Sequence, residues 1–289
     1  MNEIAPLLWT IIAEQVSGEA QEWLKSRDAG KPIDIMTAFV ATPRHVSRKQ
    51  VFPAEHQAGA LDKAVAGFSV TGWSSVRLAR VWLLTRLDSA NREEYIRNIR
   101  TLFDTAEMNE LVALYSALPL LRYPETWLAT ASDAVRSNIG LVLDAIALRN
   151  PYPAMYFSEG AWNQLVMKSI FNDKPVHLIY GLEKRANAEL ARILSDFAHE
   201  RWAAGRRVAP GVWRLVPDFV KDSTIADLKH LLDSAREDDR EAGALVCLQS
   251  GFPPALELLG LYPEIMALAG EGRLNWKNLE YTDLNTYVS

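Results

Sequence analysis

The sequence of 289 residues has only one cysteine, Cys247. A single thiol cannot form an internal disulfide, which favours a reducing compartment, and we therefore predict a cytoplasmic protein. Cys247 lies in the apolar run 242–248, and no base stands nearby in the sequence that would activate it as a nucleophile. We interpret it as a small core residue.

Long hydrophobic runs and an excess of positive charge are missing as well. The apolar N-terminal run, residues 4–13, is far shorter than the roughly 20 residues of a membrane-spanning helix, and no basic segment typical of a secretory signal precedes it. The formal net charge is −5, whereas a protein that binds mainly nucleic acid presents a basic face. We therefore predict no membrane span and no nucleic-acid partner, and we leave peripheral contact with a membrane enzyme open.

The motifs of common catalytic and metal sites are also missing. The sequence contains no G-x-S-x-G, P-loop or G-x-G-x-x-G pattern. His199 begins a motif like that of zinc proteases, but Ala203 stands where the second ligand belongs. The pairs Asp196/His199 and Asp227/His230 resemble half of a di-iron site, yet such pairs arise easily by chance in helices. We predict no catalytic residue from motifs, no metal and no cofactor.

Helical periodicity dominates the rest of the sequence. From residue 72 onward apolar residues recur at intervals of three and four, whereas the alternation typical of strands is nearly absent. The pattern predicts an all-α protein, either an irregular helical bundle or a solenoid of antiparallel helix pairs similar to HEAT or TPR proteins. The predicted helices cover residues 73–86, 91–105, 108–118, 125–148, 158–171, 187–204, 223–234, 238–249 and 254–259.

The first 70 residues are less regular than the rest. We predict a helix over residues 3–25, followed by a proline-containing stretch over 28–53 that fits a wrapping arm or a connector. The predicted organisation is thus an N-terminal helix and irregular arm over residues 1–70 and a helical domain over residues 71–289, which forms one continuous globular unit.

Several polar residues occur on helix faces that should be apolar. Buried amide and ammonium groups cost several kcal/mol unless they are paired. In one interpretation the amides tie neighbouring loops together, the lysine extends its ammonium group to solvent, and the arginine favours the C-terminal end of its helix. In the other interpretation these residues line an interior site for a small polar ligand. The candidate ligand-binding residues are Asn138, Asn163, Gln164, Lys168 and Arg201.

A set of motifs, all in the same order, resembles the EboA family. The motifs are Arg136-Ser-Asn138, Asn150-Pro-Tyr-Pro153, Ala161-Trp-Asn-Gln-Leu-Val-Met-Lys168, Arg185-Ala-Asn187, Leu190-Ala-Arg-Ile-Leu194, Ala198-His-Glu-Arg-Trp-Ala-Ala-Gly-Arg206 and Trp213-Arg214. The resemblance covers residues 70–220, while the first 50 residues and those after Gly251 are similar only loosely.

The resemblance implies a small helical bacterial protein that is encoded in a conserved gene cluster. Neighbouring genes of such a cluster encode proteins similar to a UbiA-type membrane prenyltransferase, TIM-barrel enzymes and a sugar-phosphate-cyclase-like enzyme. The cluster is linked to the making or export of specialised metabolites, including the delivery of pigment precursors to the periplasm in cyanobacteria. The partners that the resemblance implies are other proteins of the same cluster or a small polar metabolite, and it implies no catalytic residue.

Three functions from different classes fit these observations. The first is a non-catalytic adaptor or small-molecule carrier in metabolite processing or precursor trafficking, and we favour it. The second is a protein-interaction scaffold, whose partner contacts would be the aromatic residues Tyr152, Tyr156 and Phe157. The third is an enzyme with Lys168 as a general base or Schiff-base former in a desolvated pocket.

Overall fold

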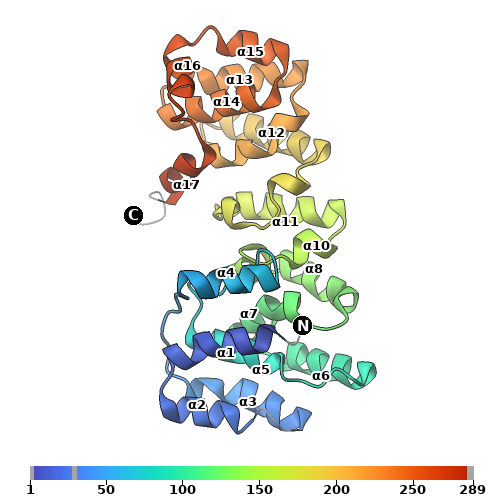
Figure 1. The fold of residues 1–289 in the computed structure, drawn as a ribbon. Helices are drawn as coiled ribbons and strands as arrows, with labels where there is room; N and C mark the ends of the chain where they lie inside the picture. Colours follow the sequence, from blue (N-terminus) through green and yellow to red (C-terminus); the bar gives the residue numbers. More distant parts are fainter. Residues whose placement is uncertain (1–2, 28–30, 285–289) are drawn as a thin grey trace. The chain divides into compact units, whose positions relative to one another are not determined.

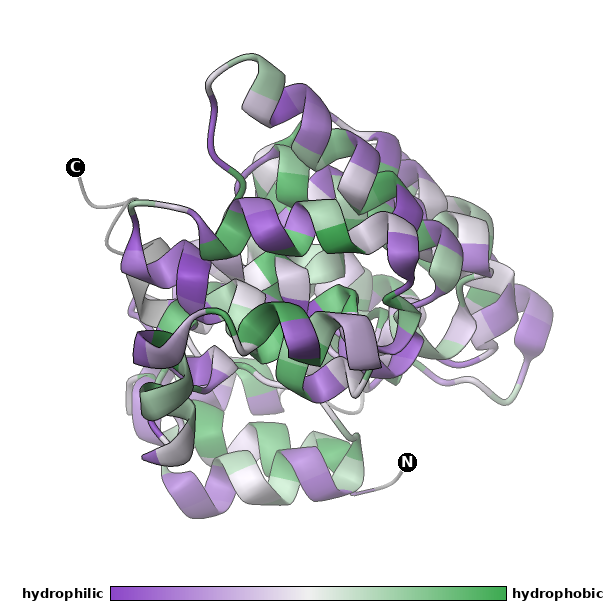
Figure 2. Ribbon diagram, turned by 90° about the horizontal axis from the view of Figure 1, so that it is seen from above, coloured by the Kyte–Doolittle hydropathy of each residue, from purple (hydrophilic) through white to green (hydrophobic). Residues whose placement is uncertain are grey.

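The computed structural model describes residues 3–27 and 31–284, which form helices joined by short connections (Figure 1). Within these ranges Gln50 and Ser74 form an isolated antiparallel bridge, and no strand or sheet is present. The prediction of an all-α protein is therefore confirmed. Most helices combine hydrophobic and hydrophilic residues along their length (Figure 2), as expected of helices with one buried face. No helix in the described ranges is both long and apolar enough to cross a lipid bilayer.

The chain forms two compact units, the first ending at Trp162 and the second beginning at Asn163. The boundary lies inside α11, Glu159–Phe171. This division differs from our predicted one at residue 70, because the N-terminal helices pack into the first unit. Helix α1 buries Ile4, Leu8, Ile11 and Ile12 and contacts α5.

Unit 1 is built around α5, almost all of whose residues are buried. Helices α1, α3 and α7 pack against α5, and α9 packs against α7. The helices of unit 1 before the boundary are α1 (Ile4–Gln15), α2 (Gly18–Lys25), α3 (Pro32–His45), α4 (Glu55–Ala64), α5 (Ser75–Leu84), α6 (Arg92–Thr105), α7 (Met108–Ala117), α8 (Leu128–Arg136), α9 (Gly140–Ala147) and α10 (Tyr152–Tyr156).

Unit 2 is built around α14, which contacts α13, α15 and the 3₁₀ helix Pro210–Leu215. Gly243 of α14 allows the close approach of α13, because a Cβ atom at this position would lie 3.0 Å from the Cβ atom of Leu231. Cys247 is fully buried in α14, as we interpreted from its apolar neighbours, and burial raises the pKa of its thiol to about 12. The helices after α11 are α12 (Ala188–Ala203), α13 (Ile225–Leu232), α14 (Glu237–Ser250), α15 (Pro253–Leu259), α16 (Pro263–Gly270) and α17 (Trp276–Leu284).

Two long helices predicted from the sequence are interrupted in the structure. The helix predicted over residues 3–25 breaks at Ser17, whose side chain accepts a hydrogen bond from the backbone of Ala20 and begins α2. The helix predicted over residues 125–148 begins as the 3₁₀ helix Pro124–Trp127 and breaks again between α8 and α9. There the Ser137 hydroxyl accepts from the Ile139 backbone at 3.1 Å, which competes with helical hydrogen bonding just before Gly140.

Candidate functional site

Asn163 is buried and holds the start of α12 against α11. Its amide exchanges two hydrogen bonds with the amide of Asn187, at 3.2 and 2.8 Å. Asn187 also begins α12, since its side-chain oxygen accepts from the backbone of Leu190 at 2.9 Å. Both amides are thus engaged within the protein, which agrees with the interpretation that Asn163 ties a neighbouring segment in place.

The other four predicted ligand-binding residues do not lie in a common interior. Asn138 is exposed in the break between α8 and α9, and Gln164 is exposed on α11, so the prediction of an interior position for these two residues is wrong. Lys168 is half-buried on α11. Arg201 donates from Nε to the carbonyl of Arg207 at 2.8 Å near the end of α12. Ligand binding by these residues stays a prediction.

The aromatic residues predicted as exposed partner contacts are largely internal. Tyr152 and Phe157 are buried, and only Tyr156 is partly accessible. The Tyr152 hydroxyl donates to the Pro124 carbonyl at 2.6 Å, and burial raises the pKa of this phenol. The correction has a simple cause: the prolines of this segment do not form an open loop but begin the short helix α10, which packs on α9.

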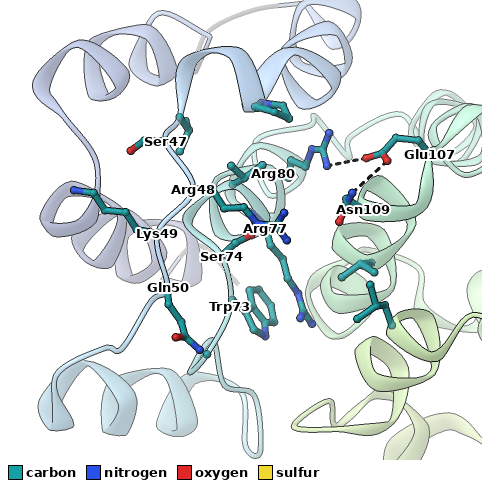
Figure 3. A pocket seen from close by; sticks show the side chains of 16 residues that line it. Ser47, Arg48, Lys49, Gln50, Trp73, Ser74, Arg77, Arg80, Glu107 and Asn109 are labelled. Atoms are coloured by element: carbon teal, nitrogen blue, oxygen red, sulfur yellow. Dashed lines mark hydrogen bonds and ion pairs between the residues drawn. The ribbon is translucent and has the colours of Figure 1, made fainter.

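The structure places the most distinctive polar site elsewhere, in a cavity of about 580 Å³ in unit 1 (Figure 3). Its walls come from the linker after α3, the turn before α5, the exposed side of α5, the start of α7, and α9. The lining residues are Pro43, Val46, Ser47, Arg48, Lys49, Gln50, Gly72, Trp73, Ser74, Val76, Arg77, Arg80, Glu107, Asn109, Val112 and Leu141.

The linker after α3, residues 46–54, forms part of the cavity wall. Hydrogen bonds from its backbone to residues 72–75 fix it beside the start of α5. The Ser75 hydroxyl donates to the Ser47 carbonyl at 2.5 Å and accepts from the Lys49 backbone at 3.0 Å. Val51 donates to the Trp73 carbonyl at 2.8 Å and accepts from the Gly72 backbone at 2.8 Å. Gly72 has φ of +80°, a left-handed conformation that favours glycine. The cavity is thus framed by an ordered backbone.

Arg80 is a buried cation among the residues that line the cavity. Its Nε donates to the Phe39 carbonyl at 3.0 Å, its Nη2 pairs with Glu110 at 3.0 Å, and its Nη1 lies 3.5 Å from Glu107. Burial lowers the pKa of Arg80, and the carboxylates of Glu110 and Glu107 act in the opposite direction. Because these partners occupy its donors, Arg80 serves mainly to join α3, α5 and α7.

Arg77, one turn earlier on α5, is held rigidly but keeps donors for a ligand. Its Nε donates to the Ser116 hydroxyl at 2.7 Å, and its guanidinium carbon lies 4.1 Å from the centre of the Trp73 ring. The terminal amino groups make no hydrogen bond with the residues that the structure describes. Burial lowers the pKa of Arg77 to about 9, and Asp144 opposes this shift, so the side chain stays charged at neutral pH.

Arg48 and Lys49 of the linker also line the cavity, and Figure 3 shows Arg48 pointing toward Arg77 and Lys49 pointing away from it. Both residues are exposed, and neither side chain forms an ion pair or hydrogen bond within the part of the chain that the structure describes. The lining thus contains four cations but a single carboxylate, Glu107, which is bound to Arg80 and to Asn109. Such a surplus of guanidinium and ammonium donors binds carboxylates and phosphates.

This site was not predicted from the sequence, although a signal was present. Arg77 and Arg80 interrupt an otherwise apolar stretch of the helix predicted over residues 73–86. The same argument that directed attention to Lys168, that a charge within an apolar helix must be paired or functional, applies to both arginines. No comparable pattern predicted that Arg48 and Lys49 line the cavity, because their position depends on how the linker folds.

The histidine that began a zinc-protease-like motif lies in a different arrangement in unit 2. His199 Nε2 is 2.5 Å from Oδ1 of the buried Asp227, and the Ser195 hydroxyl donates to the other carboxylate oxygen at 2.5 Å. His199 therefore pairs with Asp227 of α13 rather than with Asp196 of its own helix. Among the described residues no group of three potential metal ligands is gathered.

A family model described as "metabolite traffic protein EboA" matches residues 4–217. The chain belongs to the EboA family. The match includes the N-terminal helices, which the motif resemblance over residues 70–220 left out, and it includes every residue of the cationic cavity. No curated protein and no solved structure matched the chain in the corresponding comparisons.

Proposed function

We propose that this EboA protein is a non-catalytic carrier that binds an anionic small metabolite in the cationic cavity of unit 1. One observation carries the proposal: Arg48, Lys49 and Arg77 line a cavity of about 580 Å³, and no ion pair joins any of the three to a carboxylate among the described residues, although the charge of Asp144 acts on Arg77. The volume lies in the range of small-molecule sites. The family description supports a role in metabolite traffic.

The electrostatic setting supports an anionic cargo over a neutral one. Like charges gathered around a cavity repel one another, and an anion that enters relieves this repulsion while it gains charge-assisted hydrogen bonds. Arg77 is fixed by Ser116 and Trp73, so it loses little conformational freedom when a ligand binds. As a carrier, the protein would exchange the metabolite with other proteins of its gene cluster in the cytoplasm.

The test is calorimetric titration of the purified full chain with inorganic diphosphate and with citrate. The variant Arg48→Gln/Lys49→Gln removes two charges from the cavity, and we expect it to weaken binding of both anions about ten-fold or more, since charge-assisted hydrogen bonds are lost. Both side chains are exposed, so the fold should be unaffected. The matched control is Lys63→Gln/Arg97→Gln, which removes the same charge from exposed positions outside the cavity.

Absence of binding of either anion to the unmodified protein would overturn the proposal. Equal loss of affinity in the cavity variant and in the control variant would also overturn it, because the anions would then respond only to the overall charge.

A further inference from the structure

The cavity joins its cations to an apolar surface that an inorganic anion would leave exposed. Val112 of α7 and Leu141 of α9 line it, together with Val46 and Val76. Leu141 is 50 % exposed, and Val76 and Val112 are partly exposed. Because apolar surface gains free energy in proportion to the area removed from water, these side chains favour a ligand that covers them.

The size of the cavity points in the same direction. At about 580 Å³ it lies within the range that holds drug-sized organic molecules, far above the space that one phosphate group fills. The cationic donors come from the linker and α5, whereas Val112 and Leu141 come from α7 and α9. A ligand that fills the cavity therefore contacts both kinds of side chain.

We infer that the carried metabolite is an amphiphilic oxyanion, a carboxylate or phosphate group joined to an apolar body. The inference rests on the proposed function of the same cavity. The head group accepts hydrogen bonds from Arg48 and from the terminal amino groups of Arg77, which form a planar fork. The apolar body covers Val112 and Leu141, so affinity depends on both parts of the ligand.

The experiment compares short and long forms of each head group by calorimetric titration of the full chain. The probes are acetate against octanoate and inorganic phosphate against octyl phosphate, with octanol as the neutral compound, all below the concentration at which they aggregate. We expect octanoate or octyl phosphate to bind at least ten-fold more tightly than its short form, and more tightly than octanol. The tighter of the two long probes identifies the head group.

A second variant tests whether the alkyl chain of the probe binds inside the cavity rather than on any exposed apolar surface. Leu141→Asn should weaken binding of the tighter long probe about five-fold or more while the affinity for inorganic phosphate stays unchanged. Leu261→Asn serves as the control, because Leu261 is 75 % exposed and lies outside the cavity. Both positions are exposed enough for the fold to tolerate the change.

The outcomes distinguish this inference from the proposed function. If the long probes bind no more tightly than inorganic phosphate and acetate, or if Leu141→Asn leaves their binding unchanged, the inference is overturned while an anion carrier stands. If octanol binds as tightly as octanoate and octyl phosphate, or if none of the anions binds, the proposed function fails as well.

Discussion

Arg80 on α5 is 2 % exposed and donates hydrogen bonds to Phe39 of α3 and Glu110 of α7. At the scale of single residues this side chain joins three helices beside the cavity. A buried charge is tolerated only while its partner stays in place, since an unpaired charge in a low-dielectric interior loses its solvation. The partners of Arg80 thus leave Arg77 and Arg48 as the cations that face the proposed ligand.

Arg80→Met tests this role. We expect the variant to lose about 3–5 kcal/mol of unfolding free energy, because Glu110 is left buried without its cation. Urea denaturation followed by circular dichroism measures the loss. The double variant Arg80→Met/Glu110→Gln removes both charges and should recover most of the stability. A single variant as stable as the unmodified protein would contradict the argument.

At the scale of elements, the start of α14 depends on a carboxylate held by two arginines. Asp238 is 9 % exposed and accepts hydrogen bonds from Arg236 at 3.0 Å and from Arg207 at 2.8 Å. Desolvation acts to raise the pKa of Asp238, but the hydrogen bonds and charges of the two arginines outweigh it and lower the pKa below the ordinary value of 3.8. A lowered pKa in the folded state means stability that is present above about pH 4 and is lost as the pH falls further.

Asp238→Asn should therefore be less stable than the unmodified protein by about 1–2 kcal/mol at neutral pH. The difference in stability should shrink as the pH falls below 4, because Asp238 of the unmodified protein then becomes protonated and is uncharged, like the asparagine of the variant. Thermal unfolding of both proteins over a series of pH values measures it. A difference that stays constant down to pH 2 would show that the charge of Asp238 has no part in the stability.

A helix could be predicted from the sequence where the features that produce it lie within the helix itself. The helices near residues 73–86, 91–105 and 187–204 have strong apolar periodicity, and their predicted bounds lie within a few residues of α5, α6 and α12. Helices α3, α4, α10, α16 and α17 were not predicted. The prediction of an irregular arm over residues 28–53 was wrong for α3, which begins at Pro32 and buries Ile35, Ala38 and Phe39, whereas α4 buries only two of its residues and α16 only one. The prediction for residues 125–148 failed because the Ser137 turn competes with an apolar stripe that continues through it.

The candidate site was harder to predict than the helices, because packing brings its residues together from distant parts of the sequence. The argument from buried polar groups found Asn163 correctly as a buried amide, but its partner Asn187 lies 24 residues away and is chosen by packing. The cationic cavity forms where the linker after α3, the first turns of α5, α7 and α9 meet, and no local sequence pattern predicts that these segments come together.

For the whole molecule, the overall charge and the charge of the cavity lining differ in sign, which bears on the proposed binding of an anion. The net charge is −5, yet the cavity gathers four cations and one carboxylate. Since Arg48 and Lys49 are exposed, dissolved salt screens them from a ligand. The interaction should therefore depend strongly on ionic strength.

We expect diphosphate binding to weaken about ten-fold when the ionic strength rises from roughly 0.05 to roughly 0.5 M, over which the screening length shrinks severalfold. Titration at the two salt concentrations measures this change. The Arg48→Gln/Lys49→Gln variant serves as the reference and should show a much smaller dependence. Equal affinity of the unmodified protein at both concentrations would contradict an electrostatic origin of binding.

The hydrogen bonds that fix the linker after α3 use only main-chain groups of the linker. Ser47, Lys49 and Val51 contribute carbonyl oxygens or amide nitrogens, and their partners are Ser75 and the backbone of residues 72–73. Neither side chain at positions 48 and 49 takes part in holding this segment. Substitutions can therefore change the charge and size of both side chains while the backbone that frames the cavity stays in place.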